Sequence, residues 1–188
     1  MTDYIEYFEF KETIFTCDEY EENMSDEERK IKKSIKRYTG MDYNKINKCL
    51  IDKQTNIDIQ NINKSMELVR HLRLSKRFVV WRGLNNFNKN GYYDEINNLH
   101  KTKIINNYPF ISTSVSKEVA KNFAWGILLK IYIDPFEDLN YIALENNLEK
   151  EILFQPNTHF KWVGEYMEND NKIIEVELKN GIVNSSAN

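Results

Sequence analysis

The chain has 188 residues, of which 41% are hydrophobic and 13% aromatic, so it is long enough to bury one well-packed core and short for two domains. No stretch approaches the roughly 20 apolar residues of a membrane-spanning helix, and the N-terminus lacks the basic and apolar regions of a signal peptide. Cys17 and Cys49 are too few for a disulfide framework or a cysteine-ligated metal site; we expect reduced thiols, with a single bridge as the alternative.

Charge is distributed unevenly along the chain. Residues 1–28 hold eleven acids and one base, a net charge of −10, whereas the whole chain carries −3, which leaves +7 for the remainder. A moderately basic body suits a phosphate-bearing ligand or an acidic partner, and it falls short of the charge of a nucleic-acid-binding protein. The acidic segment is either a solvated surface or a regulatory or partner-binding segment, because apolar residues lie between its acids over residues 4–10.

The N-terminal part is expected to be mainly helical. Ser25 is followed by three acids, with Glu28 at the capping-box position, which predicts a helix that runs to about Arg37 before Gly40 interrupts it. Apolar residues recur at helical spacing beyond this point. Further helices are therefore predicted over residues 43–52 and 61–74.

Short runs of β-favouring residues, separated by polar loops, follow the helical part. They lie at residues 77–82, 108–113, 127–133, 139–143, 151–154, 158–163 and 172–179. Ser116 can cap one more helix, over residues 117–124. No repeat or low-complexity linker divides the chain, so we expect one α+β domain over residues 1–188. Its expected parts are an acidic segment (1–24), a mainly helical layer (25–75) and a β-rich core (76–180).

Three polar clusters lie at the ends of predicted strands, where a strand can direct side chains into a shared cleft. The clusters are Trp81-Arg82-Gly83, Ser112-Thr113-Ser114 and Glu149-Lys150-Glu151. Side chains alternate between the two faces of an extended segment, so Glu149 and Glu151 are expected on one face, close enough to act on one reacting centre.

In this order, the three clusters resemble the Arg-Ser-Glu signature of mono-ADP-ribosyltransferases, most closely the exoenzyme toxins that include the clostridial binary toxins. Residues 38–47, Tyr-Thr-Gly-Met-Asp-Tyr-Asn-Lys-Ile-Asn, are similar to a segment in the helical half of the same group. The resemblance covers about residues 30–178. It implies a helical layer packed on a two-sheet β core with an NAD cleft, NAD as co-substrate without a metal, and a transferase that acts as a toxin or virulence effector.

The resemblance also implies which residues bind the cofactor. Arg82 would hold the NAD phosphates, which suits a guanidinium because it can bond two phosphate oxygens at once, and Gly83 would let the ligand approach the backbone. Thr113 and Ser114 would complete the cofactor-binding strand that begins at Ser112. Two further candidates for cofactor or target binding lie in the helical layer, Tyr38 and Tyr43.

The catalytic residues implied by the resemblance are Glu151, Glu149 and Ser112. Ser112 would hydrogen-bond and orient Glu151, which would bind the 2′-hydroxyl of the nicotinamide ribose and stabilise the positive charge that grows as nicotinamide leaves. Glu149 would face the nucleophile. In the family, Glu at this position goes with arginine acceptors and Gln with amide-type acceptors, and a carboxylate can hold a guanidinium through two parallel hydrogen bonds.

The loop that helps to select the acceptor corresponds to residues 140–148. It lacks the aromatic residue that many members carry shortly before the Glu pair, so the target protein stays open, with Tyr141 as a distant substitute. Two other functions also remain open. One is an NAD glycohydrolase that uses water as acceptor, and the other is an inactive binding module, which the presence of the full residue set disfavours.

Several other residues are expected to be structural. Phe123, Trp125 and Trp162 lie in apolar neighbourhoods and are predicted in the core rather than stacked on a cofactor. The three histidines lack metal-ligand spacing, so no zinc site is expected. No Gly-x-Gly-x-x-Gly turn is present, which argues against a doubly wound dinucleotide-binding sheet.

The expected partners are NAD and a protein of a host or target cell that bears the acceptor arginine. Nucleic acid as acceptor is disfavoured by Glu149, and the protein is expected to be a monomer. We expect it in the cytosol of the producing cell, and the helical part is too short for a receptor-binding domain. Three alternatives stay open: an effector delivered by separate machinery, the catalytic part of a multicomponent toxin, and a phage or viral enzyme.

Overall fold

The computed structural model describes residues 14–15, 24–68, 77–84, 99, 101–107, 109–134, 140–144 and 149–178. Most of the acidic segment, Cys17 and residues 145–148 of the predicted acceptor loop lie outside this part of the chain, whereas Cys49 carries a free thiol. Within the described part, no helix is both long and apolar enough to cross a membrane.

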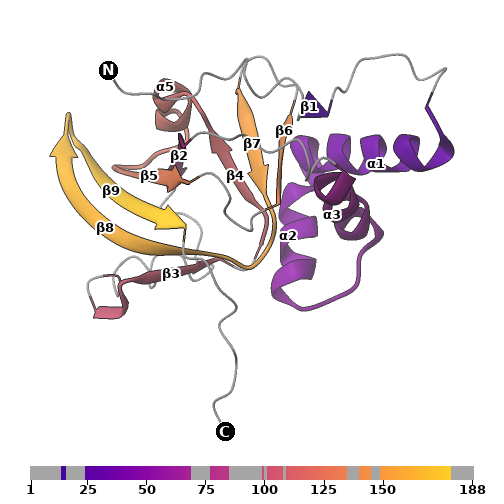
Figure 1. Cartoon of the computed structure of the whole chain (residues 1–188), viewed down its shortest axis with the longest axis horizontal. Coiled ribbons are helices and arrows are strands. Elements are labelled where there is room, and N and C mark those ends of the chain that lie inside the picture. Colours follow the sequence, from indigo (N-terminus) through magenta and orange to yellow (C-terminus); the bar gives the residue numbers. More distant parts are fainter. Residues whose placement is uncertain are drawn as a thin grey trace, which may run out of the picture.

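The helical layer consists of α1 (Asp26–Arg37), η3 (Tyr38–Asp42), α2 (Tyr43–Ile51) and α3 (Ile57–Leu68), as Figure 1 shows. The predicted capping box opens α1, because the Glu28 backbone N–H donates to Ser25 Oγ and the Ser25 N–H donates to Glu28 Oε2 at 2.8 Å. The predicted interruption at Gly40 is confirmed: its backbone is non-helical, at φ −96° and ψ −129°, inside the π-helical turn η3.

Helix α3 begins at Ile57 rather than at Asn61, so the predicted start is wrong. The reason is a cap that the hydrophobic period does not reveal: Asn56 Oδ1 accepts a hydrogen bond from the Asp58 N–H at 2.7 Å. The predicted end of this helix, Leu74, lies outside the described residues.

Outside the helical layer, the described chain contains nine strands and the short helix α5. They are β1 (Ile14–Phe15), β2 (Phe78–Leu84), β3 (Ile104–Asn107), β4 (Ile111–Ser114), α5 (Lys117–Lys121), β5 (Ile127–Ile133), β6 (Tyr141–Leu144), β7 (Glu151–Phe154), β8 (Thr158–Glu168) and β9 (Asn171–Leu178). The predicted bounds of β5 and β7 are confirmed. Strands β1 and β3 were not predicted, and α5 ends at Lys121, earlier than expected.

Strand β8 continues past its predicted end at Val163 because it forms a hairpin with β9. The hairpin turns through Asn169 and Asp170, both at positive φ (46° and 44°), as a tight type I′ turn requires. A bulge between Trp162 and Gly164 interrupts the register of this hairpin.

The strands follow the order β1-β6-β7-β4-β2-β5-β9-β8-β3, and a single residue pair, Trp81 with Ser114, joins β4 to β2. The two halves on either side of this pair run in different directions (Figure 1). They pack around one core, to which β2 and β5 contribute Val80 and Ile131 and β7 contributes Phe154. The α+β class is confirmed. The two expected sheets are the two halves of one nine-stranded sheet, which the Trp81–Ser114 pair joins.

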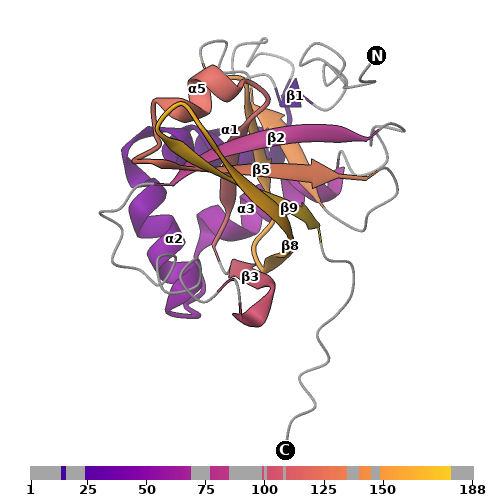
Figure 2. The ribbon, with the colours of Figure 1, turned by 90° about the vertical axis from the view of Figure 1, so that its left-hand side faces the viewer.

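The helical layer packs on the other face of the half formed by β4, β6 and β7 (Figure 1), and it lies behind the strands in the view of Figure 2. Ile35 of α1 and Met66 of α3 pack there with Leu153 of β7 in a second core cluster. Strand β7 therefore lies between two cores, since Ile152 and Phe154 enter the first while Leu153 enters the second. Its first residue is Glu151, so burial on both faces fixes the position of that carboxyl group.

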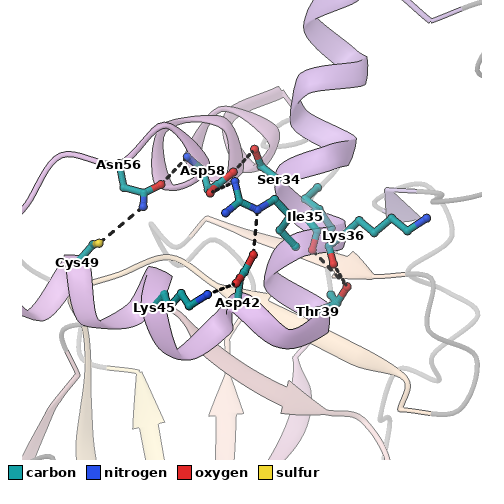
Figure 3. A network of polar contacts seen from close by, with 10 residues as sticks. Ser34, Ile35, Lys36, Thr39, Asp42, Lys45, Cys49, Asn56 and Asp58 are labelled. Carbon is teal, nitrogen blue, oxygen red and sulfur yellow. Dashed lines mark hydrogen bonds and ion pairs between the residues drawn. The ribbon is translucent and has the colours of Figure 1, made fainter.

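Figure 3 shows the polar network that joins the helices. Buried Asp58 of α3 accepts a hydrogen bond from Ser34 Oγ at 2.9 Å and forms an ion pair with Arg37 Nη1 at 2.9 Å. Arg37 Nε also bonds Asp42 at 3.0 Å, and Lys45 bonds the same carboxylate at 3.1 Å. The network ties α1 to α3 and to the kinked turn η3, and it compensates the charge of a buried carboxylate.

Candidate functional site

The predicted Ser and Glu clusters meet across the β4–β7 pairing. Glu151 lies directly opposite Ser114, Ile152 opposite Thr113, and Leu153 opposite Ser112. Opposed residues of an antiparallel pair share a face and successive residues alternate. The Glu151 side chain therefore leaves the same face as Ser112 and Ser114, whereas Thr113 faces the core.

The Glu151 carboxyl group is buried, with 5% of the residue exposed. Its pKa is raised from 4.5 to about 7, mainly because burial disfavours the charged form, and the nearby charge of Glu149 adds to this. A hydrogen bond with Ser112 and the positive charge of Arg82 lower the pKa without cancelling the increase. The structure thus brings together four of the predicted site residues around one perturbed carboxyl group.

Arg82 lies on β2, one residue beyond the pair that joins the two halves of the sheet. Its Nη1 donates to the Ser112 carbonyl oxygen at 2.7 Å, which ties the end of β2 to the strand that carries the serines. The guanidinium is a charge-assisted donor fixed beside the Glu151 carboxyl group. This geometry places a permanent positive charge at the edge of the acidic pair.

Thr113 and Ser114 use their hydroxyl protons within the chain. Thr113 Oγ1 donates to the Ile152 carbonyl oxygen at 2.8 Å, and Ser114 Oγ donates to the Glu149 carbonyl oxygen at 2.6 Å. Both residues are buried, with 4% exposed. Their observed contacts brace β7 and the turn before it, and the cofactor-binding role predicted for them stays a prediction.

The Glu149-Lys150-Glu151 segment is not extended, so that premise of the sequence argument is wrong. Strand β7 begins only at Glu151, and Lys150 adopts a left-handed conformation with φ 47°. The turn is closed by the Ser114 bond to Glu149 and by the Val115 N–H, which donates to the Lys150 carbonyl oxygen at 3.2 Å. The two carboxylates nevertheless interact, because the charge of Glu149 raises the pKa of Glu151.

The packing of α5 against β2 requires a glycine at position 83. A Cβ atom at this position would lie 2.3 Å from the Ala120 carbonyl oxygen and 2.6 Å from backbone atoms of Phe123 and Ala124. The close approach expected of a ligand is thus made by the C-terminal end of α5 and the turn that follows it. Gly83 lets this helix pack directly against β2, next to Arg82.

The two tyrosines of the helical layer differ in their surroundings. Tyr38 is 4% exposed and packs edge-on against Phe110, with ring centroids 5.4 Å apart, just before β4 begins. Tyr43 is 47% exposed at the start of α2. The roles predicted for these two tyrosines in cofactor or target binding stay predictions.

Asn47 was not singled out from the sequence, although it lies in the segment that carries the resemblance. Its Nδ2 donates to the Tyr38 hydroxyl at 3.3 Å, while its Oδ1 is buried without a hydrogen-bond partner among the described residues. A buried acceptor without a donor is uncommon and indicates a position that an external donor can satisfy. No sequence pattern reveals this, because it depends on the burial of one atom.

The aromatic residues near the site only partly follow the prediction. Phe123 and Trp125 were expected in the core but are 51% and 56% exposed, because they flank Ala124 in the turn after α5, and Ala124 is the residue packed inward there. Trp162 packs against the main core as expected. Tyr141 is also in the core, 7% exposed, so it does not supply an exposed ring to the acceptor loop.

Among the residues that the structure describes, no group of three or more His, Cys, Asp or Glu side chains could hold a metal ion. The site instead combines a buried acid, a second acid, a hydroxyl and a guanidinium. This set can bind an anionic ligand through Arg82 and stabilise a developing cation beside Glu151.

Comparisons with known proteins agree with this geometry. A family model described as ADP-ribosyltransferase exoenzyme matches residues 14–182. The C3 exoenzyme of Clostridium limosum is 20% identical, with a TM-score of 0.63 over 92% of this chain and 90% of that one. A search of curated proteins found no significant match.

Two further solved structures have the same fold. Exoenzyme S from Pseudomonas aeruginosa, in complex with human 14-3-3 protein beta and bound to Carba-NAD, is 16% identical, with a TM-score of 0.62 over 85% of this chain and 78% of that one. The ADP-ribosyltransferase Vis from Vibrio splendidus, in complex with agmatine, is 20% identical, with a TM-score of 0.58 over 90% of this chain and 80% of that one. With the family model covering most of its length, the chain belongs to the ADP-ribosyltransferase exoenzyme family of toxins.

Proposed function

We propose that the protein transfers ADP-ribose from NAD to an arginine side chain of a protein and releases nicotinamide. The observation that carries this proposal is the buried Glu151 carboxyl group, held by Ser112 and flanked by Arg82 and Glu149. Binding of Carba-NAD by exoenzyme S supports NAD as the donor.

In the proposed reaction, Arg82 binds the diphosphate of NAD and Glu151 accepts a hydrogen bond from the ribose 2′-hydroxyl. The bond between ribose C1′ and the nicotinamide nitrogen breaks, and its electron pair leaves with nicotinamide, which becomes neutral. Positive charge then develops on the ribose beside Glu151. A carboxylate fixed in a buried site stabilises that charge without reorganising, which is the usual source of a large rate increase.

Glu149 is proposed to receive the acceptor. Its carboxylate can orient a guanidinium through two hydrogen bonds and take the proton released when the nitrogen attacks C1′. The interaction between Glu149 and Glu151 supports this assignment, because it brings the acceptor group next to the reacting carbon. The complex of Vis with agmatine, itself a guanidinium compound, also supports it.

As a member of a toxin family, the protein is proposed to act on a protein inside a host or target cell after delivery. The test is incubation with labelled NAD and host-cell lysate, followed by identification of the modified residue by mass spectrometry. Wild type should label an arginine, and Glu151→Ala should lose about 10²-fold or more of NAD cleavage. Unchanged cleavage by Glu151→Ala would contradict the proposal.

A second variant separates transfer from hydrolysis. Glu149→Gln should abolish labelling of protein while nicotinamide release continues, because water needs no guanidinium-binding carboxylate. Rapid nicotinamide release by wild type without any labelled protein would instead identify water as the acceptor and the protein as an NAD glycohydrolase.

A further inference from the structure

The two acids of the site are held by different parts of the structure. Glu151 is the first residue of β7, where the three pairs that follow along β4 and the burial of the next three residues fix the strand. Its position therefore follows from a strand ladder and two hydrophobic cores. A local change outside β7 leaves those interactions in place.

Glu149 lies outside the ladder, on the far side of left-handed Lys150. Among the residues that the structure describes, two hydrogen bonds hold this turn: Ser114 Oγ donates to the Glu149 carbonyl oxygen at 2.6 Å, and the Val115 N–H donates to the Lys150 carbonyl oxygen at 3.2 Å. A positive φ is unfavourable for a residue with a Cβ atom and persists where the surroundings impose it. The direction in which the Glu149 side chain leaves the turn thus depends on these few contacts.

Ser114 connects this turn to α5. Its Oγ also accepts the Ser116 N–H at 3.0 Å, and Ser116 Oγ caps α5 by accepting the Val119 N–H at 3.4 Å. The other end of α5 packs on Gly83, next to Arg82. Helix α5 therefore connects two parts of the site: its first turn is linked through Ser114 to the backbone of Glu149, and its last turn packs on β2, the strand that carries Arg82.

From these contacts we infer that Ser114 and left-handed Lys150 form a latch that positions Glu149 for the acceptor independently of Glu151. The inference rests on the proposed function, in which Glu149 holds the acceptor and Glu151 serves cleavage of NAD. It makes Ser114 and the Lys150 backbone specificity-determining: releasing the latch diverts ADP-ribose from a guanidinium to water.

The experiment gives the purified protein labelled NAD with agmatine as the guanidinium acceptor and compares ADP-ribosyl-agmatine with free ADP-ribose. Ser114→Ala removes the hydroxyl that holds Glu149 and should lower the ratio of transfer to hydrolysis by about tenfold, since small misplacements of a reacting group are costly. Ser65→Ala is the matched control, because it also deletes a buried hydroxyl that donates to a carbonyl oxygen, here that of Ile62 within α3 at 2.6 Å. It should leave the ratio at the wild-type value, whatever it does to stability.

A second pair of variants changes only the backbone preference at position 150. Lys150→Gly and Lys150→Val both delete the exposed amine, but glycine accepts φ 47° freely whereas a β-branched residue resists it. Lys150→Gly should keep the wild-type ratio, and Lys150→Val should lower it as Ser114→Ala does. Thermal unfolding of each variant, measured beside the ratio, separates a shift in specificity from a loss of folded protein.

Two outcomes overturn the inference while leaving the proposed function intact: an unchanged ratio in both Ser114→Ala and Lys150→Val, or an equal loss of ratio in Lys150→Gly and Lys150→Val. If the wild-type protein forms no ADP-ribosyl-agmatine at all, the proposed arginine acceptor itself is wrong, and the failure is assigned to that step.

Discussion

Replacing Glu151 by Gln should stabilise the protein at alkaline pH. The structure raises the pKa of this carboxyl group from 4.5 to about 7, because it is buried, and Ser112 and Arg82 offset only part of that burial. Between these values the folded chain keeps a proton that the unfolded chain has lost, so the free energy of unfolding falls as pH rises through that window. At about 1.4 kcal/mol per pKa unit, ionising Glu151 costs the folded state about 3 kcal/mol at about pH 8.

Urea unfolding of both proteins, followed by tryptophan fluorescence between about pH 4 and about pH 8, tests this value. Gln resembles the protonated acid in shape and carries no charge, so Glu151→Gln lacks the loss of stability that ionisation causes. The wild-type free energy of unfolding should therefore fall by about 3 kcal/mol more than that of the variant over this range. Because the test compares how the free energy of unfolding changes with pH in the two proteins, any pH-independent effect of the glutamine amide on stability cancels.

Glu67→Gln provides the control, because Glu67 is an exposed acid on α3 and its loss changes the net charge in the same way. Its pH profile should run parallel to that of the wild type. Parallel profiles for wild type and Glu151→Gln would refute the argument, since they would mean that the Glu151 carboxyl group titrates alike in the folded and unfolded chain. A wild-type profile that gains more stability with rising pH than the profile of Glu151→Gln would refute it as well.

Three other substitutions test the packing around the site. Gly83→Ala should lower the free energy of unfolding by about 2 kcal/mol or more, measured in urea, because its Cβ would meet the Ala120 carbonyl oxygen at 2.3 Å. Asp58→Ala should cost about 2 kcal/mol, because it leaves Arg37 and its neighbours without their buried partner, although the half-exposed guanidinium can turn to water. Phe123→Ser should change the melting temperature little, because this ring is 51% exposed.

Elements with local signals could be predicted from the sequence. The capping box at Ser25 is complete within four residues, and the runs that form β5 and β7 carry their β preference in their own composition. The order of the polar clusters also led to Arg82 and Glu151, whose charged groups interact in the structure and whose roles stay predictions. These features depend on neighbours in the chain, which is the information that a single sequence contains.

Features that depend on distant contacts could not be predicted. The left-handed Lys150 is held by Ser114, whose bond to Glu149 spans 35 positions, so an extended Glu pair was the natural but wrong expectation. The exposure of Phe123 depends on which small residue after α5 turns inward, and an apolar neighbourhood does not decide that. Gly83 likewise serves α5 packing, a contact invisible before the fold is known.

The instability assigned to Glu151 also bears on catalysis under the proposed function. Within the described part of the chain, the buried carboxylate has one neighbouring cation, Arg82, and a second acid, Glu149, which shift its pKa in opposite directions. A positive charge that develops on the ribose would meet the Glu151 carboxylate, whose burial the fold offsets only in part, and the nearby Glu149. Interactions that strengthen only as the transition state forms raise the rate more than uniform binding does. The same burial that destabilises the resting protein at high pH is therefore the feature that suits it to stabilise a sugar cation.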